Sequence, residues 1–286
     1  MDNQNIDSNK SSIRELLTTH GFKFSKSMGQ NFLIDANVPE KIVKLSCFDK
    51  TCGVLEVGPG LGALTGELAK IAGNVTAVEL DKRLVPILQI GFADKKNVQI
   101  IQGDILKLDI KKLVDDTMAG LDHHVCANLP YNITTPAITA FIESEMFDSI
   151  IVMVQKEVAL RICAKPGSPE YGAFTVYANY YTEPEILFDV SPNSFFPRPK
   201  VTSAVVRLRK RAKRMLSKEG EKAFFRVVRA AFGQRRKTLV NALHSVFNNT
   251  HTKEEISEIV VSCGFDVRVR GEVLSVEEFA KMTPFF

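Results

Sequence analysis

The sequence predicts a doubly wound α/β domain followed by a smaller helical domain. Short apolar runs alternate with helical patterns through the first two thirds of the chain, as in a parallel sheet with helices on both faces. From about residue 209 onward the pattern changes to helices with capping signals. A chain of 286 residues has room for one large core and a small second domain. We therefore expect a disordered segment at 1–10, an α/β domain at 11–208 and a helical domain at 209–286.

The first unit of the sheet is a strand, a glycine turn and a helix. Residues 54–57 form an apolar run, the turn at 58–62 has the sequence Gly-Pro-Gly-Leu-Gly, and a helical pattern covers 64–71. Glycines let the backbone approach a ligand closely, and free N–H groups at a helix start favour acceptor groups. Nicotinamide, flavin and methyl-donor enzymes all use such turns, so the turn alone does not identify the ligand.

Acidic residues follow the next two predicted strands. The strand at 75–78 is followed by Glu79 and Asp81, and the strand at 98–102 by Asp104. In a doubly wound sheet these carboxylates lie at the edge where ribose hydroxyls and an adenine amine bind. Each acid could instead cap a helix. Three strand ends in the same register favour a ligand site.

The remaining elements follow from periodicity and capping residues. Further strands are expected at 125–127, 149–154, 182–190 and 204–208, with a helix at 135–145 and a loop at 164–171. In the helical domain we expect one helix over 224–243. Capping pairs predict the starts of three helices. One lies near the N-terminus, with Ser12 and Glu15, and two lie in the helical domain, with Thr252 and Glu255 (a helix that stops at Gly264) and with Ser275 and Glu278.

The strand at 125–127 leads into Asn128, Leu129, Pro130 and Tyr131, a group suited to an amine-bearing base. The lone pair of an adenine amine is delocalised, so acceptors must hold its two protons before it can attack. Asn128 Oδ1 is one acceptor, and Pro130 orients the Leu129 carbonyl as the second. Tyr131 can stack on a base that has left its helix. The alternative is an ordinary strand end followed by a turn.

Basic charge is concentrated where the second domain begins. Residues 198–240 hold 15 Lys or Arg residues and two acids, a net +13 in a chain whose total is +4, which leaves −9 elsewhere. Arg235, Arg236 and Lys237 are part of this segment. The excess favours contact with nucleic-acid phosphates over a merely solvated charged face.

The sequence lacks the residue patterns that several kinds of chemistry require. There is no His-Glu-x-x-His, paired Cys-x-x-Cys or Walker pattern, so no metal site is expected. The five scattered cysteines indicate reduced thiols, and we assign Cys126 to packing. His123 and His124 are expected to begin the strand at 125–127. Residues 1–10 lack an apolar signal core and no apolar run nears about 18 residues, so we expect a cytoplasmic protein without a membrane anchor.

Taken together, the chain resembles the ribosomal RNA small-subunit adenine N6-dimethyltransferase family from about residue 20 to 286. The resemblance rests on segments in the same order and spacing, which are Gly-Gln-Asn-Phe-Leu at 29–33, Glu-Val-Gly-Pro-Gly-Leu-Gly at 56–62, Glu-Leu-Asp at 79–81, Gly-Asp at 103–104, Asn-Leu-Pro-Tyr-Asn-Ile at 128–133, Gln-Lys-Glu-Val at 155–158, the run from Phe195 to Leu208, and that from Ala231 to Leu239. The fold it implies is a Rossmann-like class I methyltransferase domain with a C-terminal helical RNA-binding domain.

The resemblance also implies the cofactor and the site. The cofactor would be S-adenosylmethionine, held by six residues, which are Asn31 and Leu33 at its methionine end, Gly58 in the turn, Glu79 at the ribose, Asp104 at the adenine, and Asn128 between donor and target amine. Tyr131 and Phe195 would sandwich the target adenine, and Phe196 would take that role if the loop is shifted by one residue. Arg235, Arg236 and Lys237 would contact RNA.

The implied reaction is an in-line displacement in which the adenine nitrogen attacks the sulfonium methyl and S-adenosylhomocysteine leaves. Positioning supplies most of the catalysis, and no strong general base is required. The implied substrate is two adjacent adenines in a hairpin near the 3′ end of small-subunit ribosomal RNA, within a pre-ribosomal particle that a monomer would bind. Two alternatives stay open, which are a large-subunit methyltransferase of the antibiotic-resistance type and a non-catalytic assembly factor.

Overall fold

The computed structural model describes residues 30–286. The expected disordered segment 1–10 and the expected helix with Ser12 and Glu15 at its start lie outside the described residues. The chain divides into two compact units. Unit 1 runs to Ala159 and includes Glu185–Arg209, and unit 2 comprises Leu160–Pro184 and Lys210–Phe286. The boundary near residue 209 is close to the expected one, whereas Leu160–Pro184 groups with the C-terminal unit although the chain returns to unit 1 at Glu185–Arg209.

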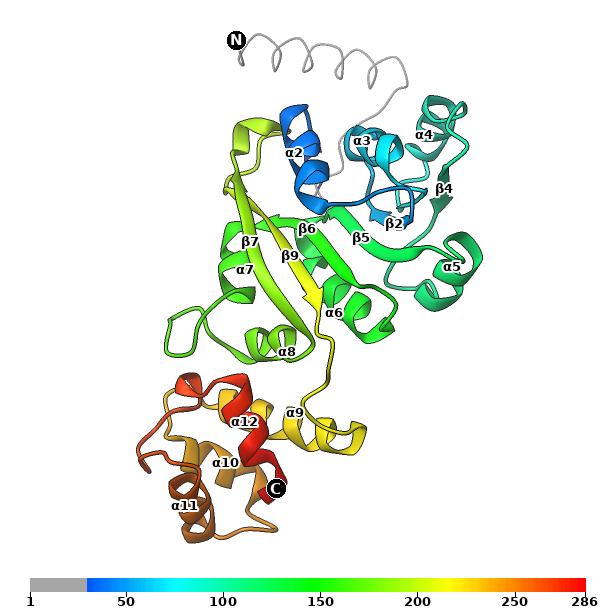
Figure 1. Ribbon diagram of the computed structural model, residues 1–286. Coiled ribbons are helices and arrows are strands. Elements are labelled where there is room, and N and C mark those ends of the chain that lie inside the picture. Colours follow the sequence, from blue (N-terminus) through cyan, green and yellow to red (C-terminus); the bar gives the residue numbers. More distant parts are fainter. Residues whose placement is uncertain (1–29) are drawn as a thin grey trace. The chain divides into compact units, whose positions relative to one another are not determined.

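Unit 1 is built on a mixed seven-stranded sheet (Figure 1). Its strands, in spatial order, are β4 (Val98–Gln102), β3 (Asn74–Glu79), β2 (Cys52–Val57), β5 (Asp122–Asn128), β6 (Ser149–Gln155), β9 (Ser203–Lys210) and β7 (Thr182–Val190). The strands from β4 to β6 are parallel, and β9 runs antiparallel to β6. This confirms the doubly wound fold and the expected bounds of β4 and β7, and the other strands differ from expectation only at their ends.

The strand order reverses between β2 and β5. From β2 the chain proceeds outward to β3 and β4, then returns to place β5 on the other side of β2. Loops that follow β2 and β5 therefore separate and leave a crevice at the carboxyl ends of the strands, where ligands bind in open α/β sheets. The glycine turn follows β2 and Asn128 ends β5, so both lie at this crevice.

Helices connect the strands of unit 1. They are α2 (Asn37–Ser46), α3 (Ala63–Ile71), α4 (Val85–Gly91), α5 (Ile110–Thr117), α6 (Thr134–Ser144) and the start of α7 (Lys156–Ile162). Ile42 of α2 and Leu68 of α3 pack against Val54, Cys126 and Ile151 on one face of the sheet. The sequence indicated α3 and α6 but neither α2 nor the shorter α4, α5 and α7.

A small second sheet joins two segments that are far apart in the sequence. Strand β1 (Phe32–Leu33) pairs antiparallel with β8 (Phe195–Phe196), with Phe32 opposite Phe196 and Leu33 opposite Phe195. Two residues are too few to show a period, so no sequence pattern indicated these strands. The pairing brings the segment at 30–33 to the rim of the crevice.

Unit 2 contains α8 (Ala173–Tyr181), α9 (Lys218–Gly233), α10 (Leu239–Phe247), α11 (Lys253–Ser262) and α12 (Val276–Met282). The capping boxes of α11 and α12 form as expected, with Thr252 and Ser275 as the N-cap residues. Gly264, at φ +92°, follows the end of α11. Among the described residues, no helix is both long and apolar enough to cross a membrane.

The single helix expected over 224–243 is wrong, because the chain breaks it after Gly233. Gln234 leaves the helical region at φ −132° and ψ 64°. Thr238 then caps α10 by accepting a hydrogen bond from the Asn241 backbone N–H, and the Leu239 N–H donates to the Val269 carbonyl at 2.7 Å. The Thr238 cap and the Val269 carbonyl thus replace the backbone hydrogen bonds that a continuous helix would have made at this point. The basic residues 235–237 consequently lie in an exposed turn rather than on a helix face.

Candidate active site

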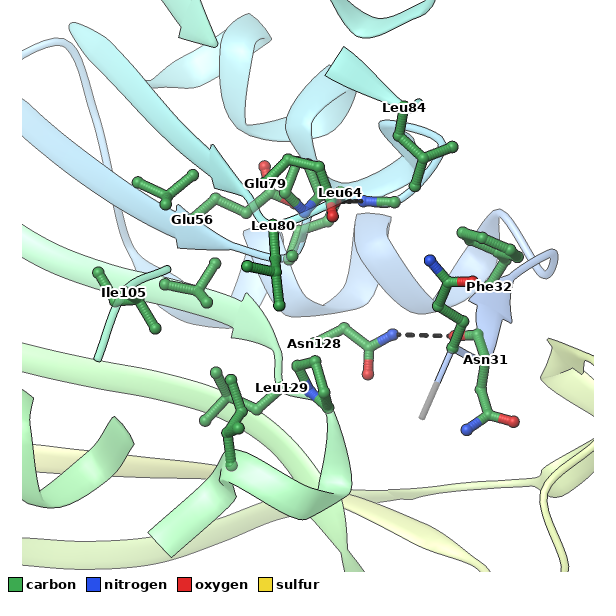
Figure 2. Close-up of a pocket in the computed structure, with 18 of the residues that line it drawn as sticks. Asn31, Phe32, Glu56, Leu64, Glu79, Leu80, Leu84, Ile105, Asn128 and Leu129 are labelled. Atoms are coloured by element: carbon green, nitrogen blue, oxygen red, sulfur yellow. Dashed lines mark hydrogen bonds between the residues drawn. The ribbon is translucent and has the colours of Figure 1, made fainter. Parts of the chain in front are cut away.

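A pocket opens at the carboxyl ends of β2, β3, β4 and β5, under the segment at 30–33 (Figure 2). All six residues expected to hold a donor line it, namely Asn31, Leu33, Gly58, Glu79, Asp104 and Asn128. Leu129, Pro130 and Tyr131 line the same pocket. The structure therefore brings together residues as far apart in the sequence as Asn31 and Asn128, which are separated by 97 positions.

The glycine turn between β2 and α3 requires its glycines. Gly58, Gly60 and Gly62 have φ values of 67°, 61° and 83°, a region that residues with a side chain rarely adopt. A Cβ atom at Gly62 would lie 2.6 Å from the Phe92 ring, and one at Gly60 would lie 3.0 Å from the Phe32 ring. The turn is therefore both conformationally restricted and closely packed against the Phe32 and Phe92 rings.

Glu79 is fixed at the end of β3 by two backbone donors. Its Oε2 accepts a hydrogen bond from the Gly60 N–H at 3.2 Å (Figure 2). Its Oε1 accepts a second one from the Asp81 N–H at 2.8 Å. The side chain is only 5% exposed, and this burial raises the pKa of the carboxyl. The two N–H groups hold the carboxylate in one orientation at the pocket wall.

The acids after β3 and β4 do not cap helices, which was the alternative interpretation. The α4 N-cap is Leu84, without a side-chain bond, and the α5 N-cap is Asp109. Asp104 instead accepts a hydrogen bond from the Leu106 N–H at 3.1 Å and lies 3.6 Å from Lys107 Nζ. Its carboxylate turns back on its own loop at the mouth of the pocket.

Asp81 ties the segment at 30–33 to the loop after β3. Arg83 donates to both of its oxygens, from Nε at 2.9 Å and from Nη2 at 2.6 Å. Gln30 Nε2 donates to Oδ2 at 2.9 Å. The hydrogen bonds from Arg83, the largest influence, lower the pKa of Asp81 to about 2, so this link persists throughout the neutral range.

Glu56, a residue that we did not assign to the site, also lines the pocket. It is 1% exposed, and Thr65 Oγ1 donates to its Oε2 at 2.6 Å. Burial raises its pKa to about 8 despite this hydrogen bond. The available signal was an acid inside the apolar run Val-Leu-Glu-Val at 54–57, because a charged residue in a buried strand needs a specific reason.

Replacing Glu56 with glutamine should stabilise the chain increasingly as the pH rises. The pKa is about 8 in the folded chain and 4.5 in the unfolded reference, so the wild type loses stability between these values as the unfolded state releases its proton first. A glutamine side chain does not titrate, and its Oε1 could still accept from Thr65. Urea unfolding from pH 4 to 9 should show the free energy of unfolding of Glu56→Gln gaining on the wild type up to about pH 8 and then levelling off. A difference that does not change with pH would contradict the raised pKa.

Two acceptor oxygens are left available where β5 ends. Asn128 Nδ2 donates to the Asn31 carbonyl at 3.4 Å, which turns Oδ1 away from that contact (Figure 2). The Leu129 N–H donates to the Met153 carbonyl at 3.2 Å, and the Pro130 carbonyl accepts from the Ile133 N–H at 3.1 Å. Within residues 30–286, no group donates to Asn128 Oδ1 or to the Leu129 carbonyl. The backbone carbonyl of Asn31 was not foreseen as the group that orients Asn128.

Tyr131 begins a 3-10 turn after β5, and its hydroxyl shares a hydrogen bond with Ser203 Oγ at 2.8 Å. Its ring is half-buried at the pocket. Phe195, expected to face it, is 2% exposed and packs in the core of unit 1 beside Leu33. The structure therefore does not bring the Phe195 ring to the pocket as expected. Phe196, whose side chain alternates to the other face of β8, is half-buried and remains the alternative for the stacking role, although neither phenylalanine is among the residues that line the pocket.

The three basic residues of the 234–238 turn differ in their surroundings within unit 2. Arg235 Nη2 donates to the carbonyls of Pro169 and Tyr171 at 3.2 and 3.4 Å and lies 3.7 Å from Glu272. Arg236 and Lys237 are exposed, and no ion pair joins either of them to another described residue. Arg235 thus has a structural role in addition to the expected one.

Cys126, His123 and His124 lie in packing or strand-start positions outside the pocket. Cys126 is fully buried in the sheet, and burial raises its pKa well above the ordinary value for a thiol. His123 Nε2 lies 3.1 Å from the Met118 carbonyl, and His124 Nδ1 lies 3.1 Å from Ser149 Oγ, both at the start of β5. In the described part of the chain, no cluster of three His, Cys, Asp or Glu side chains could hold a metal ion.

Comparison with known sequences gives consistent matches over nearly the whole chain. Residues 21–281 match the sequence model of a family described as "Ribosomal RNA adenine dimethylase". A Clostridioides difficile protein called "Ribosomal RNA small subunit methyltransferase A" is 44% identical over 278 residues, covering 96% of this chain and 95% of its own length. A Geobacillus protein with the same description is 44% identical over 273 residues, covering 94% of each chain.

Solved structures resemble the fold. A dimethyladenosine transferase from Plasmodium falciparum matches with a TM-score of 0.74 at 23% identity, over 88% of this chain and 95% of that one. The 23S rRNA methyltransferase ErmE matches with a TM-score of 0.71 at 24% identity, over 89% of this chain and 99% of that one. At such identities the likeness supports the Rossmann-like architecture and no finer assignment.

Proposed function

The chain belongs to the ribosomal RNA adenine dimethylase family, and we propose that it dimethylates N6 of two adjacent adenines in a hairpin near the 3′ end of small-subunit ribosomal RNA. The observation that carries the small-subunit assignment is the 44% identity, over 96% of this chain, to a relative described as a small-subunit methyltransferase. The methyl donor in this proposal is S-adenosylmethionine. The assignments of the donor pocket, the adenine site and the RNA contacts each rest on their own physical argument.

The donor pocket has the chemistry that a sulfonium compound needs. We assign the donor to the six residues Asn31, Leu33, Gly58, Glu79, Asp104 and Asn128, which line one pocket. Carboxylates in the wall favour a positively charged ligand, and the glycines of the turn leave backbone N–H groups accessible at close range. Glu79 has the fixed orientation that recognition of paired ribose hydroxyls requires. When bound, S-adenosylmethionine supplies the methyl group.

The acceptor site holds the adenine amine. Asn128 Oδ1 and the Leu129 carbonyl are the two acceptors for its two protons, and Pro130 restricts the backbone conformation of Leu129. Holding both protons turns the nitrogen lone pair out of conjugation, and the same oxygens stabilise the amine as it becomes cationic. Tyr131 and Phe196 provide the aromatic faces for a base that has left its stack.

RNA recognition is assigned to the basic segment at 198–240, with Arg236 and Lys237 as phosphate contacts in unit 2. The partner is a pre-ribosomal small subunit, which the chain binds as a monomer. A protein with this partner works in the cytoplasm, and a role in assembly of the subunit follows from the same partner. We also retain the division into a methyltransferase domain that ends at residue 208 and a helical RNA-binding domain that begins at residue 209.

Neutralising Arg236 and Lys237 together should weaken RNA binding and its salt dependence. Each lost phosphate contact lowers the slope of log K against log salt by about 0.7 to 0.9, so the double alanine variant should lose about 1.4 to 1.8 in slope. Filter binding across a range of salt concentrations measures this. Arg235→Ala is the comparison, because it also removes the bonds to the carbonyls of Pro169 and Tyr171 and should lower thermal stability. An unchanged slope in the double variant would contradict the contact.

Transfer of labelled methyl groups to purified undermethylated small and large subunits tests the substrate. Nucleoside mass spectrometry should find N6-dimethyladenosine in small-subunit RNA only. Product confined to large-subunit RNA would replace the proposal with the large-subunit alternative. Binding to the small subunit without any transfer would instead support a non-catalytic assembly factor. The likeness to ErmE does not favour the large subunit, since at 24% identity it is a likeness of fold.

A further inference from the structure

We propose that Ser203 is a positioning residue that fixes the Tyr131 ring at the target-base slot. The inference rests on the proposed function, because it concerns the stacking of the adenine. Its basis is the 2.8 Å hydrogen bond between Ser203 Oγ and the Tyr131 hydroxyl, which joins the start of β9 to the turn after β5.

Ser203 is a rigid anchor. It is 0% exposed and is the first residue of β9, where it pairs with Gln155 of β6. Next to it, the Thr202 carbonyl accepts a hydrogen bond from the Lys156 N–H at 2.9 Å. The hydroxyl that Tyr131 meets is therefore held by the central sheet rather than by a loop.

Tyr131 needs an anchor because its backbone gives little constraint on the ring. It lies in a single 3-10 turn of three residues, and its side chain is half-buried. The ring can rotate about two side-chain bonds, and a hydrogen bond at its far end restricts both. Burial raises the pKa of Tyr131, so the hydroxyl remains neutral and bonded at the pH where the enzyme works.

The hydrogen bond attaches the Tyr131 ring, which lines the pocket, to the central sheet. The orientation of this ring is thus set before a base enters. A base that must leave its stack gains most from a slot that needs no reorganisation, because ordering a ring on binding costs affinity.

Three variants test this role, which are Ser203→Ala, Tyr131→Phe and the double substitution. Tyr131→Phe keeps the ring and removes the same hydrogen bond from the other side. Loss of one neutral hydrogen bond corresponds to a decrease of about threefold to tenfold, which we expect in the single-turnover rate of methyl transfer. The double variant should be no slower than either single one. Dissociation constants for S-adenosylmethionine and for RNA should stay within about twofold of the wild type, because the ring itself is kept.

Ser149→Ala is the matched control. Its hydroxyl lies 3.1 Å from His124 Nδ1 at the opposite end of the same sheet, so the variant loses a comparable bond away from the pocket. We expect it to transfer methyl groups at the wild-type rate. A similar fall in melting temperature for Ser149→Ala and Ser203→Ala, with slower transfer only in the latter, would support the inference.

Three results would overturn it. They are a wild-type transfer rate in both Ser203→Ala and Tyr131→Phe, effects that multiply in the double variant, and a donor affinity that falls as much as the rate. Tyr131→Phe keeps the test valid if Ser203→Ala does not fold, because position 131 is not in the core. Absence of transfer to small-subunit RNA by the wild type would overturn the proposed function instead, so the two failures are distinct.

Discussion

Replacing Asn128 with alanine should reduce kcat for methyl transfer by about 100-fold to 1,000-fold, the usual effect of removing one preorganised polar group at a site of developing charge. Asn128 Oδ1 has no donor among the described residues, so it is available to the adenine amine. Without it, one N6 proton loses its acceptor and the lone pair returns toward the ring. RNA binding should be retained, since phosphate contacts carry most of it. Single-turnover kinetics with saturating donor and small-subunit RNA measure the change.

Asn128→Asp separates the acceptor from the rest of the side chain. The carboxylate keeps an acceptor oxygen but cannot donate to the Asn31 carbonyl, so this variant should be slower than the wild type and faster than alanine. Asn249→Ala, in the exposed turn after α10, is a control for the loss of an asparagine as such. Wild-type turnover by Asn128→Ala would contradict the acceptor role.

Replacing Glu79 with alanine should weaken binding of S-adenosylmethionine by about 10-fold to 100-fold, because hydrogen bonds to a charged group each contribute about 1.5 to 3 kcal/mol. The substitution removes the acceptor proposed for the ribose. It also releases the N–H groups of Gly60 and Asp81, which Glu79 holds at 3.2 and 2.8 Å. The glycine turn then loses part of its support. Isothermal titration with the donor measures the dissociation constant.

Two further variants sharpen the Glu79 result. Glu79→Gln keeps one acceptor oxygen and loses the charge, so its affinity should lie between those of the wild type and the alanine variant. Glu67→Ala, on α3, removes an acid whose partner is Lys70 near the surface and should leave donor affinity unchanged. An unaltered dissociation constant in Glu79→Ala would mean that the donor is held by other groups.

The central sheet was predictable because parallel strands covered on both faces are continuous apolar runs. The apolar runs at 54–57 and 75–78 are followed by Gly58 and Glu79, where the strands reach the ligand edge. The edge strand β4 is less apolar and only partly buried, and it is followed by Gly103. The same logic placed Asn128 at the end of β5. The residue that follows a strand can be read directly from the sequence, so the residues of the pocket wall could be predicted from the strand ends.

The remaining features depend on tertiary contacts that the sequence does not display. The break between α9 and α10 requires a bond from Leu239 to the distant Val269 carbonyl. Phe195 and Phe196 are chemically identical, and only the pairing of β8 with β1 decides which one is buried. Arg235 resembles its basic neighbours until the loop at 164–171 and the 3-10 turn at 271–273 are brought beside it. Local propensity cannot rank such alternatives.

The paired phenylalanines of β8 make this part of the fold sensitive to chain length. A slip of one residue along a strand exchanges the side chains of its two faces. In β8 such a slip would move Ser194 into the core position of Phe195, or Pro197 into the position of Phe196. Either change removes one aromatic ring from its present place, so we expect an insertion or deletion near residue 194 to be poorly tolerated.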